Sequence, residues 1–266
     1  MTRFKFSPIV YLFGFASLIL LMVLFFPLLN TLVSISPDSF FGNFSDPQLL
    51  DSLGLTFTCA LVAVLIGLMT GVPLAYLLAR YNFFGRDLLQ ALVNLPVIIP
   101  HTAAGVALLL VFGRNGAFGR IFERIGITFT DQPAGVVIGM LFVSVPFLVN
   151  ASREAFSNVD PEMELASLVD GANQWQKIRF VTLPQCWRGI SSGALMMWAR
   201  GVSEFGAVVI LAYHPKIMPV LVYERFQGFG LKAALPATVL LILVSLIIFI
   251  CVSVFLFPNT RKAKFL

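Results

Sequence analysis

The sequence predicts an all-α integral membrane protein with six transmembrane helices, and its composition and apolar runs support this fold class. Hydrophobic residues make up 58% of the 266 residues, charged residues make up 12%, and 27 residues are Phe. The mean hydropathy is +0.91. The charged share is about half of that found in soluble domains. Lipid is therefore the expected solvent for most of the chain.

Six apolar runs are long enough to cross a bilayer, whose hydrocarbon core of about 30 Å requires roughly 20 residues per helix. Runs of this length must be helical, because lipid cannot satisfy exposed peptide groups. We expect residues 1–266 to form a single transmembrane domain. Its spans are predicted at 8–34, 53–79, 88–113, 133–152, 189–212 and 233–258.

The first run follows Arg3 and Lys5 and therefore has the beginning expected of a secretory signal peptide. Its apolar stretch is too long for such a signal, and no A-x-A-like cleavage site follows it. We therefore expect this run to remain as the first span.

The basic residues predict that both termini lie inside the cell. With the N-terminus inside, eleven Lys and Arg residues fall on the cytoplasmic side, six fall outside, and Arg200 lies within a span. The cluster Arg114 to Arg124 weakens this contrast without reversing it. The pI of 9.3 follows from the topology and implies no nucleic-acid partner. The predicted location is the plasma or inner membrane, as a multi-pass protein whose longest cytoplasmic loop is 153–188.

Cysteines and histidines indicate no metal site. Cys59 and Cys251 lie in spans, Cys186 lies near the cytoplasmic edge, and no C-x-x-C occurs, so a disulfide framework is not indicated either. The two histidines, His101 and His214, are far apart in the sequence. We interpret the cysteines as packing residues.

The 153–188 loop is predicted to contain two short amphipathic helices. Asp160 can cap the first helix, Pro161 suits its first position, and Gly171 is placed to end it after about ten residues. The second helix contains Trp175, and Leu183-Pro184 is expected to end it before the fifth span.

Short helices are marginal alone and must bury their apolar stripe, here Leu165, Leu168, Val169 and Ala172. The first helix carries acidic residues and no base, so anionic lipid would repel it. A groove on another protein is the better match. Packing against the protein's own bundle is the alternative.

The same loop resembles the "EAA" cytoplasmic signature of ATP-binding-cassette (ABC) importer permeases. The resemblance is carried by Glu164, Ala166, Ser167 and Gly171, followed by Leu183-Pro184 twelve and thirteen positions after the Gly. Ser167 stands where a second Ala is usual, and Asp170 adds an acid before the Gly. These departures concern the details of docking rather than the class.

Other stretches resemble the branch of these permeases that imports tetrahedral oxyanions, most of all the molybdate and tungstate permeases and next the sulfate permeases. They are "GVPLAYLLAR" (71–80), "NLPVIIPHTAAGVALL" (94–109), "FGRNGAFGR" (112–120), "SEFGAVVILA" (203–212) and "YHPKIMPVLVYERF" (213–226).

The resemblance implies a homodimer in which each copy presents a coupling helix to one of two separate ATPase subunits. ATP and Mg would then be bound by the ATPase, with no cofactor in this chain, and an extracytoplasmic oxyanion-binding protein would deliver the substrate. The coupling residues implied are Glu164, Ala166, Ser167, Asp170, Gly171, Ala172, Leu183 and Pro184. This chain is not expected to be an enzyme, because it has no G-x-x-x-x-G-K-[ST] motif.

Ionisable groups inside a membrane are costly and mark functional sites by default. Arg200 and Glu204 are four residues apart and are expected to pair on the fifth span, fixing its rotation or contacting the partner subunit, with direct anion contact as the alternative. Two prolines before His101 should bend or unwind the third span. The candidate residues for the translocation path or gate are Pro96, Pro100, His101, Arg200, Ser203, Glu204 and Gly206.

For the glycines of the second span we expect a packing role, with hinge motion as the alternative. Gly67 and Gly71 form a G-x-x-x-G that permits close helix approach. The segment Tyr213–Lys232 either meets the binding protein or folds as a re-entrant or surface loop.

Three other functions compete with that of a molybdate/tungstate permease. The first is a sulfate/thiosulfate ABC permease. The second is a secondary transporter that uses Glu204, but the two halves show no convincing internal similarity. The third is a membrane-embedded enzyme, for which the sequence offers no H-E-x-x-H, paired intramembrane Asp or G-x-S-x-G.

Overall fold

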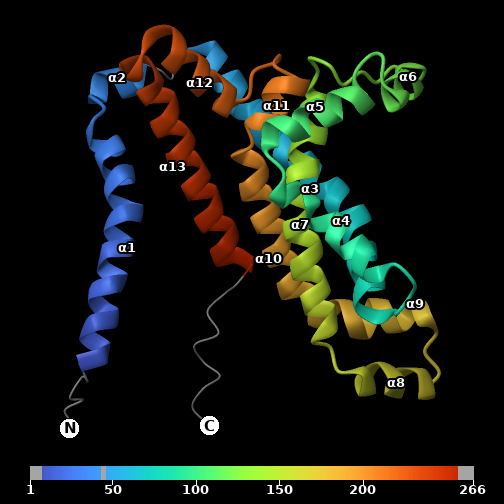
Figure 1. The fold of residues 1–266 in the computed structure, drawn as a ribbon. Helices are drawn as coiled ribbons and strands as arrows, with labels where there is room; N and C mark the ends of the chain where they lie inside the picture. The colour runs from blue at the N-terminus through green and yellow to red at the C-terminus, as the bar shows by residue number, and fades with distance from the viewer. Residues whose placement is uncertain (1–7, 43–45, 257–266) are drawn as a thin grey trace.

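The computed structural model describes residues 8–42 and 46–256, and within these ranges all regular structure is helical. At the centre, α3 (Pro47–Arg80), α7 (Pro133–Ser157) and α10 (Leu183–Val202) pack along one another (Figure 1). The basic residues predicted at both termini, from Arg3 and Lys5 to Lys264, lie outside the described ranges.

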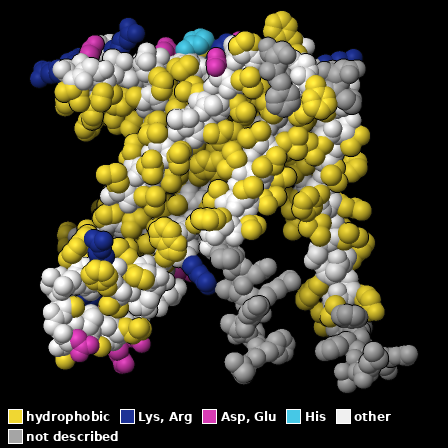
Figure 2. Space-filling view, turned by 180° about the vertical axis from the view of Figure 1, so that it is seen from behind, with side chains coloured by type: hydrophobic (Ala, Val, Ile, Leu, Met, Phe, Trp, Pro, Cys, Tyr) yellow, Lys and Arg dark blue, Asp and Glu magenta, His cyan; other side chains and the backbone are white. Residues whose placement is uncertain are grey.

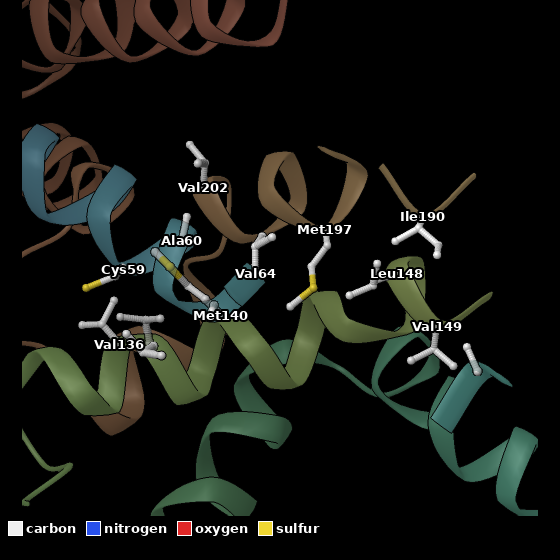
Figure 3. Close-up of a cluster of buried hydrophobic side chains, with 14 of the residues drawn as sticks. Cys59, Ala60, Val64, Val136, Met140, Leu148, Val149, Ile190, Met197 and Val202 are labelled. Atoms are coloured by element: carbon white, nitrogen blue, oxygen red, sulfur yellow. The ribbon is translucent and has the colours of Figure 1, made fainter. Parts of the chain in front are cut away.

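The core between these three helices is built from small and medium apolar side chains. Figure 3 shows Cys59, Ala60 and Val64 facing residues of α7 and α10. A Cβ atom on Gly67 would lie 2.7 Å from the Met197 side chain, and one on Gly71 would lie 3.1 Å from Val149. The close helix approach predicted for the G-x-x-x-G pair is therefore confirmed.

Two apolar helices lie beside this core. α1 (Pro8–Val33) stands apart from the bundle, and α13 (Leu231–Leu256) lies between α1 and α10 (Figure 1). None of the most apolar part of α1 is buried, and 11% of that of α13 is. At the upper end of the view, α2 (Pro37–Gly42) and α12 (Met218–Phe229) lie beside them.

Among the described residues, four to five membrane crossings are supported by length and apolar character, the larger number if a bent helix pair is one span. Four are single helices, α1, α3, α7 and α13, and the fifth is the bent pair α4 (Arg86–Ile98) and α5 (His101–Phe112). The bend expected in the span predicted at 88–113 is thus confirmed, because the two helices meet at 115°. α5 leads into the short helix α6 (Ala117–Glu123).

The bend between α4 and α5 has a local cause. Pro100 lacks an amide hydrogen and disfavours a helical conformation at Ile99, which is extended with ψ 145°. Pro96 lies buried inside α4 and does not break it. Of the two prolines expected to unwind this span, only the second does so.

The predicted span at 189–212 also requires correction. α10 starts earlier, at Leu183, and ends at Val202, and after a break at 203–205 the chain continues as α11 (Gly206–Leu211). α10 contains Arg188 and Arg200 and is not among the helices long and apolar enough to cross a membrane on these criteria alone. The break follows from Glu204, whose Oε1 accepts the Ala207 amide hydrogen (2.8 Å) at the start of α11.

Candidate functional site

At the lower end of Figure 1, α8 (Pro161–Val169) and α9 (Gln174–Lys177) form a bent segment. We call residues 160–177 the elbow. The Asp160 carboxylate accepts the Glu162 amide hydrogen at 2.9 Å, and Pro161 occupies the first turn. The predicted start of this helix is therefore confirmed.

The bend of the elbow is fixed from both sides. Gly171 has φ +93°, its amide donates to the Leu168 carbonyl (3.1 Å), and the Ala172 amide donates to Ser167 (3.0 Å). These are the two hydrogen bonds of a Schellman motif, which ends a helix at a left-handed Gly. Asn173 and Gln176 then form a capping box that starts α9. The predicted role of Gly171 as a helix stop is confirmed.

The expected end at Leu183-Pro184 is wrong, because the helix continues through it. α9 runs into the π-helix η2 (Ile178–Thr182), and η2 runs into α10. Pro184 has no amide to donate and its ring would crowd a regular turn, and the wider π turn accommodates this. The Leu183 amide accordingly donates to Ile178, five residues earlier. The elbow is thus continuous with a core helix.

Glu164 faces inward rather than toward a partner. Its residue is 7% exposed, and its Oε1 accepts from Arg80 Nη2 (3.0 Å) and from Thr182 Oγ1 (2.6 Å). Lys177 Nζ lies 4.0 Å from the other oxygen. Arg80 Nη2 also donates to the Val159 carbonyl at 3.1 Å. One carboxylate therefore joins α8 to the end of α3 and to η2.

The outer face of α8 is apolar and exposed. Met163 is 53% exposed, Leu165 60% and Val169 88%, and Ala166 is exposed beside them. Acidic side chains gather at the tip of this end in Figure 2, where Asp160, Glu162 and Asp170 are exposed. The stripe predicted to need a burial partner is therefore mostly unburied within the chain itself.

A second polar site lies where the two helix breaks meet. Arg200 Nη2 lies 2.9 Å from Glu204 Oε2 and 2.6 Å from His101 Nε2. A guanidinium has only donors, so His101 accepts through Nε2. Arg200 Nη1 donates to Ser203 Oγ at 3.2 Å, and Glu204 is only 1% exposed. The predicted pairing of Arg200 with Glu204 is confirmed, and His101 joins it.

The backbones of α5 and α11 touch at this second site. A Cβ atom on Gly206 would lie 2.8 Å from His101 Cβ, and one on Gly105 would lie 2.9 Å from the Ala207 carbonyl oxygen. Pro100 immediately precedes this contact as the residue before α5. These glycines are required by close approach, and they hold the two breaks together.

Sequence reasoning missed a polar ladder between α4 and α7. Asn150 donates to Asn94 (2.7 Å) and accepts from Gln90 (2.8 Å). The available signal was three amide side chains within otherwise apolar runs.

Sequence reasoning also missed the ion pairs that fix α12, namely Arg225 with Asp46 and Lys216 with Glu224. With Met218 and Leu221 buried, α12 within the 213–232 segment packs against the rest of the chain.

Comparison with known proteins decides the class. Residues 71–259 match the family described as "Binding-protein-dependent transport system inner membrane component". The chain belongs to this family. The match includes the elbow and both helix breaks, and the predicted resemblance to importer permeases is thereby confirmed.

Relatives of this inner membrane component carry names of oxyanion permeases. The molybdate/tungstate transport system permease protein WtpB of Thermococcus kodakarensis is 39% identical over 205 residues, covering 77% of this chain and 78% of the relative. WtpB of Methanocaldococcus jannaschii is 35% identical over 237 residues, covering 89% and 93%. The sulfate transport system permease protein CysT of Escherichia coli is more distant, at 29% over 255 residues, covering 94% and 90%.

The fold is also that of a solved transporter chain. In the crystal structure of a bacterial alginate ABC transporter in complex with an alginate pentasaccharide-bound periplasmic protein, one chain matches with a TM-score of 0.76. The two chains are 20% identical, and the match covers 96% of this chain and 95% of the other. This likeness shows the fold of an ABC transporter permease.

Proposed function

We propose that this protein is the transmembrane permease subunit of an ABC importer that passes molybdate or tungstate across the cell membrane. The observation that carries the proposal is the elbow, whose outer face is exposed and apolar while its inner face is bound to α3 and continuous with α10. The names of the WtpB relatives support the substrate class.

The proposed topology has six crossings with both termini in the cytoplasm. The fifth crossing is α10 together with α11, in which Arg200 is tolerated because it is paired with Glu204 within the protein. Figure 1 supports this orientation, since α1 begins and α13 ends on the side of the molecule where α8 and α9 lie. The elbow then faces the cytoplasm.

Two copies of the chain would form a homodimer, and two ATPase subunits would bind its two elbows. The ATPase would hold ATP and Mg. The exposed side chains Met163, Leu165 and Val169 suit a groove that accepts one face of a helix. Movement of α8 would reach the core through Gly171, Ala172, Leu183 and Pro184, since the chain from Gln174 to Val202 is one continuous helical path.

The second polar site is the proposed gate. Arg200 uses its donors on Glu204, His101 and Ser203, so it fixes the helix breaks instead of presenting an open anion site. A path that releases its cargo should not bind it tightly, and an extracytoplasmic oxyanion-binding protein would therefore supply selectivity. Glu204 also has both oxygens bonded, which counts against its use as a proton carrier in secondary transport.

Reconstitution in proteoliposomes tests the proposal. The complex of this chain with its ATPase and binding protein should take up molybdate or tungstate only when ATP is present, and an ionophore that collapses the proton gradient should leave uptake intact. Sulfate delivered by the same binding protein should be taken up less. Uptake without ATP, or loss of uptake on adding the ionophore, would refute the ABC importer assignment. A preference for sulfate would indicate a sulfate permease instead of a molybdate or tungstate permease.

A further inference from the structure

We propose that Arg80 is the positioning residue that couples α8 to α3, so that ATPase movement reaches two core helices and not only one. This inference rests on the proposed function and deepens it. The residues that carry it are Arg80, Glu164 and Thr182, and of these the resemblance assigns only Glu164, as a contact for the ATPase.

The first step is the set of connections available to α8. Apart from its ends, α8 packs mainly against α9 and η2, and both continue into α10. Movement of α8 therefore reaches α10 along the chain. α3 ends at Arg80, which is 84 positions from Glu164 in the sequence, so α3 has no comparable covalent route.

The second step is the geometry of the Arg80 contact. Arg80 Nη2 donates both to Glu164 Oε1 (3.0 Å) and to the Val159 carbonyl (3.1 Å) just before α8. The same Glu164 oxygen accepts from Thr182 Oγ1, and Thr182 is fully buried. The side chains of Arg80 and Glu164 are 15% and 9% exposed, so water competes little for the contact. Charge-assisted bonds of this kind are stronger than neutral ones.

The third step is the direction of the Glu164 side chain. A Glu164 carboxylate that bound the ATPase would have to give up its hydrogen bonds to Arg80 and Thr182. The Arg80 guanidinium would then be left without its anionic partner in a mostly buried position. Truncating one partner of such a pair is strongly destabilising for that reason. The arrangement suits a permanent internal link, and the exposed apolar side chains of α8 remain for the ATPase.

The test compares Arg80→Gln with Arg86→Gln in the complete complex. Arg86 lies at the other end of the short connection between α3 and α4 and carries the same charge, but its hydrogen bonds go to Leu78 and Asn82 instead of Glu164. The readout is the coupling ratio, that is, molybdate transported per ATP hydrolysed, together with ATPase co-purification. We expect R80Q to retain the ATPase but lose at least about fivefold in coupling ratio, the lower range of typical allosteric couplings. R86Q should match the wild type.

Charge reversal sharpens the test. Arg80→Glu and Glu164→Arg should each uncouple the complex, and the double variant should recover part of the ratio because the pair is restored. A coupling ratio for R80Q equal to the wild type would overturn the inference. So would loss of ATPase binding in Glu164→Gln with normal binding in R80Q, because Glu164 would then be an ATPase contact.

Two safeguards keep the outcomes separate. If R80Q does not give folded protein, Arg80→Lys is compared with Arg86→Lys, and equal coupling ratios in these two would overturn the inference. If the wild-type complex itself shows no ATP-dependent uptake, the proposed function fails before any variant is compared. The inference about Arg80 is tested by the variants only when the wild-type complex transports, so its failure and that of the proposed function are distinguishable.

Discussion

Two buried glutamates, Glu164 and Glu204, are each bound to an arginine, and they differ in what they connect. Glu164 joins side chains of three elements, α3, α8 and η2, next to a helix face that is exposed. Glu204 bonds to its own helix break and, through Arg200, to His101 at the start of α5. The first arrangement is suited to transmit movement between elements, and the second to fix a local geometry.

Their surroundings support this distinction. Around Glu204, glycines at 105 and 206 bring two backbones into contact, so a Cβ atom at either position would clash. Around Glu164 the neighbouring Gly171 has no atom within 4 Å of a Cβ position, and its constraint is conformational. Substitutions should therefore damage stability around Glu204 and coupling at the elbow.

The largest effect is expected for Arg200→Met. This change leaves Glu204 buried without its cation, which typically costs about 3–5 kcal/mol. The thermal unfolding temperature of the purified protein should fall sharply, and the yield should fall with it. The double variant Arg200→Met/Glu204→Gln should recover much of the loss because the unpaired charge is gone. Equal stability of the single and double variants would show that the pair fixes nothing.

Gly105→Ala should cost about 1–3 kcal/mol, as expected for overpacking. The new Cβ would lie 2.8 Å from Ile210 Cβ and 2.9 Å from the Ala207 oxygen, and backbone cannot yield easily. Gly228→Ala in α12 is the matched control, since nothing lies within 4 Å there, and it should be neutral or slightly stabilising. A tolerated alanine at 105 would mean that α5 and α11 separate readily.

Gly171→Ala sharpens the comparison at the elbow. An L residue in the left-handed region costs roughly 1–2 kcal/mol, although there is room for the methyl group. The coupling ratio should fall clearly, whereas the unfolding temperature should fall only slightly. The reason is that the turn angle of the elbow changes while the core is untouched. Gly54→Ala in α3, at ordinary φ and with nothing within 4 Å, serves as the control. Normal coupling in the Gly171 variant would count against the elbow as the lever.

The conformation of the elbow could be predicted wherever the type of a single residue determines the local backbone conformation. Asp160, Pro161 and Gly171 each favour one local conformation, and the helix start and stop followed from them. The end at Leu183-Pro184 was not predictable, because a π turn absorbs the proline and periodicity does not reveal such turns. The bend after Pro100 was expected, but its 115° angle depends on packing with α11.

The long-range contacts that form the two sites could not be predicted from the sequence. Arg80 and Glu164 are 84 positions apart, and His101 and Arg200 are 99 apart, so their meeting depends on the whole bundle. The pairing of Arg200 with Glu204 was predictable because four residues bring two side chains to one helix face. Local spacing thus predicts the pair of Arg200 and Glu204, whereas the contact with His101 depends on tertiary packing.

The smallest effect is expected at a third, more exposed pair, which provides a reference for the two buried ones. Lys216 donates to Glu224 at 2.8 Å, and this hydrogen bond, helped by charge attraction and opposed by partial desolvation, lowers the pKa of Glu224 below its ordinary 4.5. A carboxylate with a lowered pKa in the folded state adds stability above pH 4.5, and that stability is lost as the pH falls through the folded value.

Glu224→Gln should therefore lower the unfolding temperature slightly near pH 6, and this effect should shrink as the pH falls below 4.5. The difference corresponds to less than about 1 kcal/mol, because the carboxylate is more than a third exposed and water screens the pair. Lys216→Gln should remove the same pH dependence. A difference between wild type and E224Q that stays constant over this range would mean that the charge of Glu224 contributes nothing to holding α12.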